Sequence, residues 1–227
     1  MVKNKKLLFT LVIYFVLFYT AWAGFGWLIA NHFFDWTGNN EIVIQIIRAG
    51  IVKNIVWTLP AFILIKYFEN DCYIGLKEMF TTKVKIVDVL PVFILCIIYT
   101  LAGVFRTGDW SIVDSFGWSK TIIVLTVGIT EEMVFRGWLL NVTVKNADTE
   151  WKQWVAIFIN AVLFLTIHFP IWLYEGVFFR NFQSFAFTSI IILSCMFSWL
   201  FVKTKNILVP VALHMLYDLL VFMFIGG

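Results

Sequence analysis

Residues 121–144 read TIIVLTVGITEEMVFRGWLLNVTV, an apolar run that carries Glu131, Glu132 and Arg136 in its interior. A helix of about 20 apolar residues crosses the hydrocarbon core of a bilayer, so this run is long enough to span a membrane. An ionisable side chain at mid-bilayer costs about 2.5–3.5 kcal/mol on the insertion scale, and such residues usually face a cavity or a charged partner. The stretch therefore predicts a membrane helix with a functional interior face.

The composition of the whole chain is that of a membrane protein. Of its 227 residues, 61% are hydrophobic and 14% are charged, whereas about a quarter of the residues of soluble domains are charged. We predict an all-α fold, a polytopic membrane helix bundle that forms a single membrane domain over residues 1–227. About seven transmembrane helices are expected, at 7–30, 47–68, 86–105, 120–142, 153–172, 184–202 and 207–225. The second is the least regular, because it contains Lys53 and Pro60, and segment 41–52 is alternatively the start of an interfacial helix.

The distribution of lysine and arginine predicts the orientation, because cytoplasmic loops carry an excess of positive charge. With the N-terminus in the cytoplasm, the inside segments carry eleven of these residues: Lys3, Lys5, Lys6, Lys66, Lys77, Lys83, Lys85, Lys145, Lys152, Lys203 and Lys205. The outside segments carry four: Arg48, Arg106, Lys120 and Arg180. Ala21-Trp22-Ala23 resembles a signal-peptide cleavage site, but the apolar run continues to Ala30, so we expect a retained span.

Cysteine usage and net charge exclude other classes of protein. The three cysteines lack the paired or metal-type spacing of a disulfide framework or a zinc ribbon. Cys96 and Cys195 lie inside apolar runs and are expected to be packing residues, while Cys72 lies in a loop. The net charge of +3 gives no reason to expect a nucleic-acid partner.

The spacing of the charges in the central run separates the two glutamates. Glu132 and Arg136 are four residues apart, so they share one face of the helix and are expected to form an ion pair. Glu131 is rotated by about 100° from Glu132 and points elsewhere. We therefore hypothesise that Arg136 neutralises Glu132 and leaves Glu131 unpaired.

Two further predicted helices carry polar residues at the same spacing. Asn160, Phe164 and His168 form a stripe on the fifth predicted span, and His214 and Asp218 form one on the seventh. Counted at about 1.5 Å per residue from the cytoplasmic ends, the ionisable residues of the three helices fall in the middle of the bilayer. The three stripes together predict a shared buried site.

Each residue also has a purely structural interpretation. Glu132 and Arg136 would be only an ion pair, and a membrane histidine often packs through a hydrogen bond. Asn160 is typical of a contact between helices. Lys53, near the end of its predicted span, is expected to extend its ammonium group to the membrane interface.

Three ordered motifs resemble those of the CPBP family, the CAAX proteases and bacteriocin-processing enzymes that are also called the ABI family. The motifs are EExxxR (Glu131, Glu132, Arg136), FxxxH (Phe164, His168) and HxxxN/D (His214, Asp218). The resemblance covers about residues 130–220, within a catalytic core expected at 120–225. The first three predicted spans match the family only in being membrane helices.

The resemblance implies an intramembrane endopeptidase. Glu131 would be the general base that activates water, His168 would hold that water, and His214 and Asp218 would stabilise the oxyanion. The supporting residues would be Glu132, Arg136, Phe164 and Asn160. Many members have asparagine where this chain has Asp218. Because an ionised aspartate only accepts hydrogen bonds, Asp218 would either donate in its protonated form or orient His214.

A metal site is the alternative within enzymes. Glu131, His168 and His214 would provide three zinc ligands with an open position, but the chain has no H-E-x-x-H motif to support this. We therefore expect no cofactor, with zinc as the alternative.

The substrate implied by the resemblance is a membrane-bound peptide or a prenylated protein within the lipid bilayer. The abundance of lysine, asparagine, isoleucine and phenylalanine favours a bacterial cell membrane, and with it bacteriocin self-immunity or peptide processing. Two other classes stay open: a small proton-coupled transporter, because buried carboxylates and histidines also build proton relays, and a non-catalytic immunity or binding protein of the same fold. The sequence predicts no oligomeric state.

Overall fold

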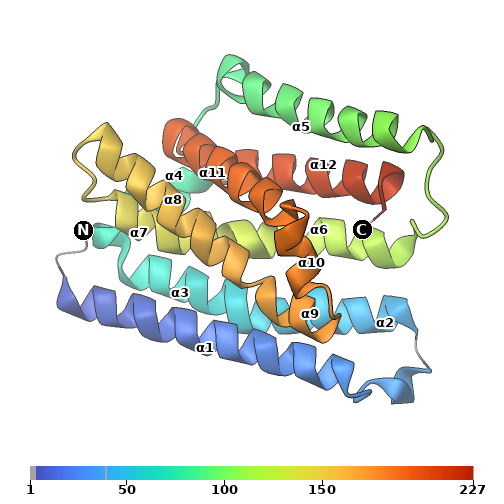
Figure 1. The fold of residues 1–227 in the computed structure, drawn as a ribbon. Coiled ribbons are helices and arrows are strands. Elements are labelled where there is room, and N and C mark those ends of the chain that lie inside the picture. Colours follow the sequence, from blue (N-terminus) through green and yellow to red (C-terminus); the bar gives the residue numbers. More distant parts are fainter. Residues whose placement is uncertain (1–3, 39, 227) are drawn as a thin grey trace.

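The computed structural model describes residues 4–38 and 40–226, and over these residues the chain is helical without any β-strand. The predicted all-α class is thus confirmed (Figure 1). Lys3, one of the charges used for the orientation, lies outside the described residues.

The N-terminal half begins with the long helix α1 (Lys5–Ala30) and the short turn η1 (Asp35–Thr37). A second continuous helical rod follows, made of α2 (Glu41–Gln45), the π-helical segments η2 (Ile46–Val52) and η3 (Asn54–Thr58), and α3 (Leu59–Tyr67). The turn η4 (Glu69–Asp71) and the short helix α4 (Leu76–Thr81) lead to α5 (Ile86–Thr107).

The C-terminal half begins with a third continuous rod of α6 (Trp118–Glu132), the π-helical segment η5 (Met133–Leu140) and α7 (Asn141–Val144). It continues with α8 (Glu150–Thr166), the short helices α9 (Phe169–Tyr174) and α10 (Phe178–Gln183), α11 (Ala186–Thr204) and α12 (Leu208–Phe224).

Five helical segments are long and apolar enough to cross a membrane: Lys5–Ala30, Glu41–Tyr67, Ile86–Thr107, Glu150–Tyr174 and Ala186–Thr204. They correspond to the first, second, third, fifth and sixth predicted spans. The other two predicted spans correspond to the rod from α6 to α7 and to α12, a shorter apolar helix of 17 residues. The protein is therefore a polytopic membrane bundle, and the number seven stays a prediction.

The second span begins earlier than predicted, at Glu41 instead of residue 47. Segment 41–52 is thus part of one helical rod and does not form a separate interfacial helix. Pro60 lies inside this rod, just after the π-helical segment η3, and the helix continues past it.

The rod from α6 to α7 runs through the middle of the bundle (Figure 1). It packs against α12 through α6, against α3 and α8 through η5, and against η2 and η3 through α6. All residues from Thr130 to Val142 are buried. Because a helix that is enclosed on all sides belongs to the interior of a bundle, the charged residues of the quoted stretch lie inside the protein and not against lipid.

Helix α1 links the second rod to the end of α8. The Tyr14 hydroxyl donates to the carbonyl of Trp57 at 2.8 Å, and the indole N–H of Trp22 donates to the carbonyl of Ile167 at 3.2 Å. Phe18 packs edge-on against Trp57, with ring centroids 5.2 Å apart. These contacts fix the N-terminal helices against the helices that carry the motifs.

The helices alternate in direction between two ends of the bundle. The described start of α1, helix α4 and the connections from α7 to α8 and from α11 to α12 lie at one end (Figure 1). The connections from α1 to α2 and from α5 to α6, together with α9 and α10, lie at the other. This is the alternation that the predicted orientation requires.

The cysteines occupy the predicted places. Cys96 lies within α5, Cys195 within α11 and Cys72 in the loop before α4, and all three are free thiols.

Candidate active site

Glu132 and Arg136 form the predicted ion pair inside the helix. Arg136 Nη1 donates to Glu132 Oε1 at 3.0 Å, and both side chains are completely buried. The same oxygen of Glu132 lies 2.8 Å from His214 Nδ1, on α12. Glu132 therefore connects the central rod to the helix that carries the third motif.

The guanidinium group of Arg136 also connects the rod to α8 and α11. Its Nε donates to Ser198 Oγ at 3.2 Å, and its Nη2 donates to the carbonyl and hydroxyl oxygens of Ser194 at 2.9 and 2.8 Å. The group lies over the ring of Phe164, 5.0 Å from the centroid. Ser194 and Ser198 were not predicted as site residues, although their spacing of four is the same signal that marked the other helices.

Asn160 fills the role of a contact between helices. Its amide Nδ2 donates to the carbonyl of Phe135 at 2.8 Å, and its Oδ1 accepts from Ser198 at 3.3 Å. Phe135 belongs to η5, where the widened turns alter the usual backbone pairing. Asn160 and Phe164 thus support the site through the network around Arg136 and contact η5 from α8.

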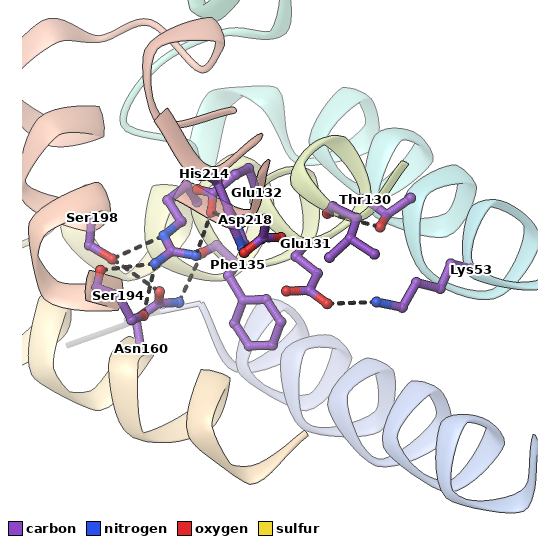
Figure 2. Close-up of polar contacts among 12 residues, drawn as sticks. Lys53, Thr130, Glu131, Glu132, Phe135, Asn160, Ser194, Ser198, His214 and Asp218 are labelled. Atoms are coloured by element: carbon purple, nitrogen blue, oxygen red, sulfur yellow. Dashed lines mark hydrogen bonds and ion pairs between the residues drawn. The ribbon is translucent and has the colours of Figure 1, made fainter. Parts of the chain in front are cut away.

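Glu131 points away from this network (Figure 2). Its Oε1 lies 2.6 Å from the ammonium nitrogen of Lys53, and both side chains are buried. Two predictions are wrong here: Lys53 does not extend to the interface, and Glu131 is not left unpaired. The reason is tertiary, because η2 and η3 pack along α6 at the height of Glu131.

His168 lies just beyond the end of α8 and is only partly buried. Its Nδ1 is 3.1 Å from the carbonyl oxygen of Phe164. Because a carbonyl only accepts, Nδ1 carries the proton, and in the neutral ring Nε2 is an acceptor. The ring is wedged between those of Phe164 and Trp172, with centroids 5.4 and 5.9 Å away.

His214 is held from both sides of its ring. Nδ1 faces Glu132, and Nε2 lies 3.7 Å from Asp218 Oδ2, which is longer than a hydrogen bond. The ring of Phe197 packs against the imidazole with a centroid distance of 5.4 Å. Asp218 therefore faces His214 as a charge partner that is not hydrogen-bonded to it.

The four predicted catalytic residues surround one region of the interior. His168 and His214 both lie within electrostatic range of Glu131. Asp218 is in turn within range of both Glu131 and Lys53. The predicted stripes of α6, α8 and α12 thus converge, and the second rod adds Lys53.

The zinc alternative would need Glu131, His168 and His214 to face one ion. Among the described residues, no group of three or more His, Cys, Asp and Glu side chains is placed to hold a metal ion. Glu131 is engaged by Lys53, and His214 is engaged by Glu132. The set Glu131, His168 and His214 is therefore not assembled as a metal site.

Comparison with known proteins places the motifs in a family. Residues 114–220 match the family model described as type II CAAX prenyl endopeptidase Rce1-like. The match runs from just before α6 into α12 and contains all three motifs, whereas Lys53 and α1 lie outside it. Neither a curated protein nor a solved structure matches the chain. Residues 114–220 of this integral membrane protein thus resemble the Rce1-like type II CAAX prenyl endopeptidases, a family of hydrolases that act on peptide bonds.

Proposed function

We propose that the protein cleaves a membrane-bound peptide or a prenylated protein inside the bilayer, with Glu131 as the general base. The observation that carries this proposal is that the adjacent carboxylates of Glu131 and Glu132 point into different surroundings. Glu132 is buried in the network of Arg136 and His214, while Glu131 faces the region shared with His168 and His214. One carboxylate thus has a structural role, and the other is available for chemistry.

The proposed reaction is the addition of water to the scissile carbonyl. Glu131 accepts a proton as the water oxygen bonds to the carbonyl carbon, and the carbonyl oxygen becomes an oxyanion. When the tetrahedral intermediate collapses, the C–N bond breaks and the proton passes from Glu131 to the leaving amine. No external reactant other than water is consumed.

The two histidines suit different parts of this reaction. Since His168 donates through Nδ1 to Phe164, its neutral ring offers Nε2 as an acceptor for the attacking water. His214 donates through Nδ1 to Glu132, so a donor at Nε2 exists only in the imidazolium form. We assign His168 to holding the water and the protonated ring of His214, flanked by Asp218, to stabilising the oxyanion.

The test is the substitution Glu131→Gln in protein reconstituted into liposomes with membrane-anchored reporter peptides. Half of the peptides would carry an S-farnesyl cysteine and half would not. Comparing the cleavage of the two sets shows whether the substrate must be prenylated. We expect Glu131→Gln to lower kcat by about 10²–10⁴-fold, the usual contribution of a general base. Glu150→Gln, at the exposed start of α8, is the matched control and should leave the rate unchanged.

Thermal unfolding of each variant separates loss of chemistry from loss of folding. Because Glu131→Gln leaves the Lys53 charge without its partner, the double variant Lys53→Met with Glu131→Gln is measured beside it. A folded Glu131→Gln protein that cleaves as fast as the wild type would overturn the proposal. Proton-dependent uptake of a solute by the same liposomes would instead favour a transporter.

For the biological role, we propose a bacterial cell membrane and either self-immunity against a bacteriocin or peptide processing. The support is the amino-acid composition, rich in lysine, asparagine, isoleucine and phenylalanine. Cells that express the wild type or Glu131→Gln at equal levels would be challenged with bacteriocins. Protection that requires Glu131 supports enzymatic immunity, whereas protection by both proteins supports a non-catalytic binding role.

A further inference from the structure

The second rod contributes a buried cation to the active site from outside the matched part of the chain. The Lys53 side chain is 5% exposed, and its ammonium nitrogen lies 2.6 Å from Glu131 Oε1. That nitrogen also lies over two indole rings, 4.8 Å from the centroid of Trp22 and 4.5 Å from that of Trp57. The amine is thus enclosed by one carboxylate and two aromatic faces.

The local backbone is specialised at this point. Lys53 stands between the π-helical segments Ile46–Val52 and Asn54–Thr58. Segments of this kind are rare overall, but where they occur they are often found at functional sites. Both segments pack against α6, so the rod delivers the lysine to the glutamate instead of to the interface.

Trp22 connects this cation to the second motif. Its ring packs under the Lys53 ammonium group, while its indole N–H donates to the carbonyl of Ile167, the residue before His168. One tryptophan of α1 therefore touches both the partner of Glu131 and the backbone beside the proposed water-binding histidine. This arrangement makes the N-terminal helices part of the site.

A general base must be ionised before it can take a proton from water. In an apolar interior an unpartnered carboxyl group avoids its charge by binding a proton. The ammonium group of Lys53 compensates the charge of Glu131 and engages Oε1, which leaves the other carboxylate oxygen for the water. Arg136 does not supply this compensation, because it pairs with Glu132.

We propose that Lys53 is a positioning residue of the active site, which holds Glu131 as an oriented carboxylate through a contact of the N-terminal helices. The proposal rests on the function proposed above for Glu131. It adds a requirement that the matched residues 114–220 do not contain. It also explains why a lysine is enclosed at this depth when a neutral residue would pack there at less cost.

The first experiment reads the ionisation of Glu131 without any need for cleavage. Dicyclohexylcarbodiimide reacts with protonated carboxyl groups in apolar surroundings, and mass spectrometry locates the adduct. In the reconstituted full-length protein we expect slow labelling of Glu131, and labelling about tenfold or more faster in Lys53→Met, as expected when a charge partner is removed. Lys53→Arg, which keeps the charge, should label as slowly as the wild type.

Matched variants make this result specific. Lys66→Met removes another lysine of the same rod, one that pairs at 2.8 Å with Glu69 in an exposed position, and it should leave the labelling of Glu131 unchanged. Glu131→Gln defines the background. If Lys53→Met does not fold, Lys53→Gln takes its place. Equal labelling of Glu131 in the wild type and in the folded uncharged variant would overturn the proposal.

The second experiment measures cleavage of the reporter peptides by the same variants. We expect Lys53→Met to lower kcat by about 100-fold, within the range of a lost general base, with KM changed less than twofold. Lys53→Arg should restore most of the rate. A wild type that labels as expected but cleaves no peptide would refute the protease function and leave the Lys53–Glu131 pairing intact.

Discussion

At the scale of single residues, the two adjacent glutamates of the central rod have different cationic partners. Arg136 compensates Glu132, and Lys53 compensates Glu131. Removing one member of such a buried pair typically costs about 3–5 kcal/mol, because it leaves an uncompensated charge. Asp218 is the exception, because the nitrogen that it faces, Nε2 of His214, lies 3.7 Å from its Oδ2, which is longer than a hydrogen bond.

The substitution Asp218→Asn tests what the carboxylate of Asp218 does beside His214. An asparagine donates hydrogen bonds through its amide, whereas an ionised aspartate only accepts them and repels an oxyanion. We expect the substitution to raise kcat/KM by about threefold or more, since it adds a donor where negative charge develops. The measurement is cleavage of the reporter peptides at saturating and limiting concentration. A fall in the rate would show that the negative charge of Asp218 is needed to keep His214 protonated.

The sequence predicts those residue pairs that form within one helix. Glu132 with Arg136 and His214 with Asp218 follow from a spacing of four, because the helix itself brings such residues together. Lys53 and Glu131 are 78 residues apart, and only the packing of the second rod on α6 makes them neighbours. Ser194 and Ser198 carried the same spacing signal, but serine is common in membrane helices and its pattern is less informative.

At the scale of helices, the site depends on a close approach between α6 and α12. A Cβ atom placed on Gly128 would lie 2.7 Å from Met215 Cγ and 3.3 Å from the carbonyl oxygen of Val211. Small residues at such contacts let the backbones of membrane helices come together. Gly128 lies one turn before Glu132, and Met215 follows His214, so this contact sets the distance between the first and third motifs.

Gly128→Ala should therefore loosen the site. Because one of the atoms that it meets belongs to the backbone, we expect the substitution to lower the free energy of unfolding by about 1–3 kcal/mol, as overpacking does elsewhere. Cleavage should fall in parallel, since the contact between Glu132 and His214 lengthens. The control is Gly24→Ala on α1, where a Cβ meets nothing within 4 Å. Equal stability of both variants in thermal unfolding would contradict this account.

The existence of the helices was easier to predict than their internal geometry. The apolar runs indicated where the chain crosses the membrane, but not the π-helical turns of η2, η3 and η5. A shift of the backbone hydrogen bonds by one residue leaves no trace in hydrophobic periodicity, because it depends on which neighbouring side chain donates to the exposed carbonyl oxygen. Asn160, which donates to Phe135, is such a neighbour.

At the scale of the whole molecule, the bundle places its connecting loops at two ends (Figure 1). Seven spans with a cytoplasmic N-terminus would put the loop from α7 to α8 inside the cell and the loop from α5 to α6 outside. Ser111 and Asp148 are exposed positions in these two loops. They therefore offer a direct test of the predicted orientation.

Cysteines introduced at Ser111 and Asp148, in a background where the three native cysteines are replaced by alanine, should react differently in intact cells. We expect a membrane-impermeant maleimide to label Ser111→Cys in whole cells and Asp148→Cys only after the membrane is opened. Labelling is read as a mass shift of the purified protein. The reverse pattern would invert the orientation, and labelling of both sites in whole cells would reduce the number of spans between them.

The enclosed central rod has a consequence for how the protein is made. Five helical segments pass a test of length and hydropathy for crossing a membrane by themselves, and the rod that carries Glu131 is not among them. During synthesis this segment leaves the ribosome after the helix that holds Lys53 and before the helices that hold Ser194 and His214. Glu131 can therefore pair with Lys53 of a helix that is already in the lipid. This pairing lowers the cost of inserting the central rod if the N-terminal helices stay beside the translocon until that rod arrives.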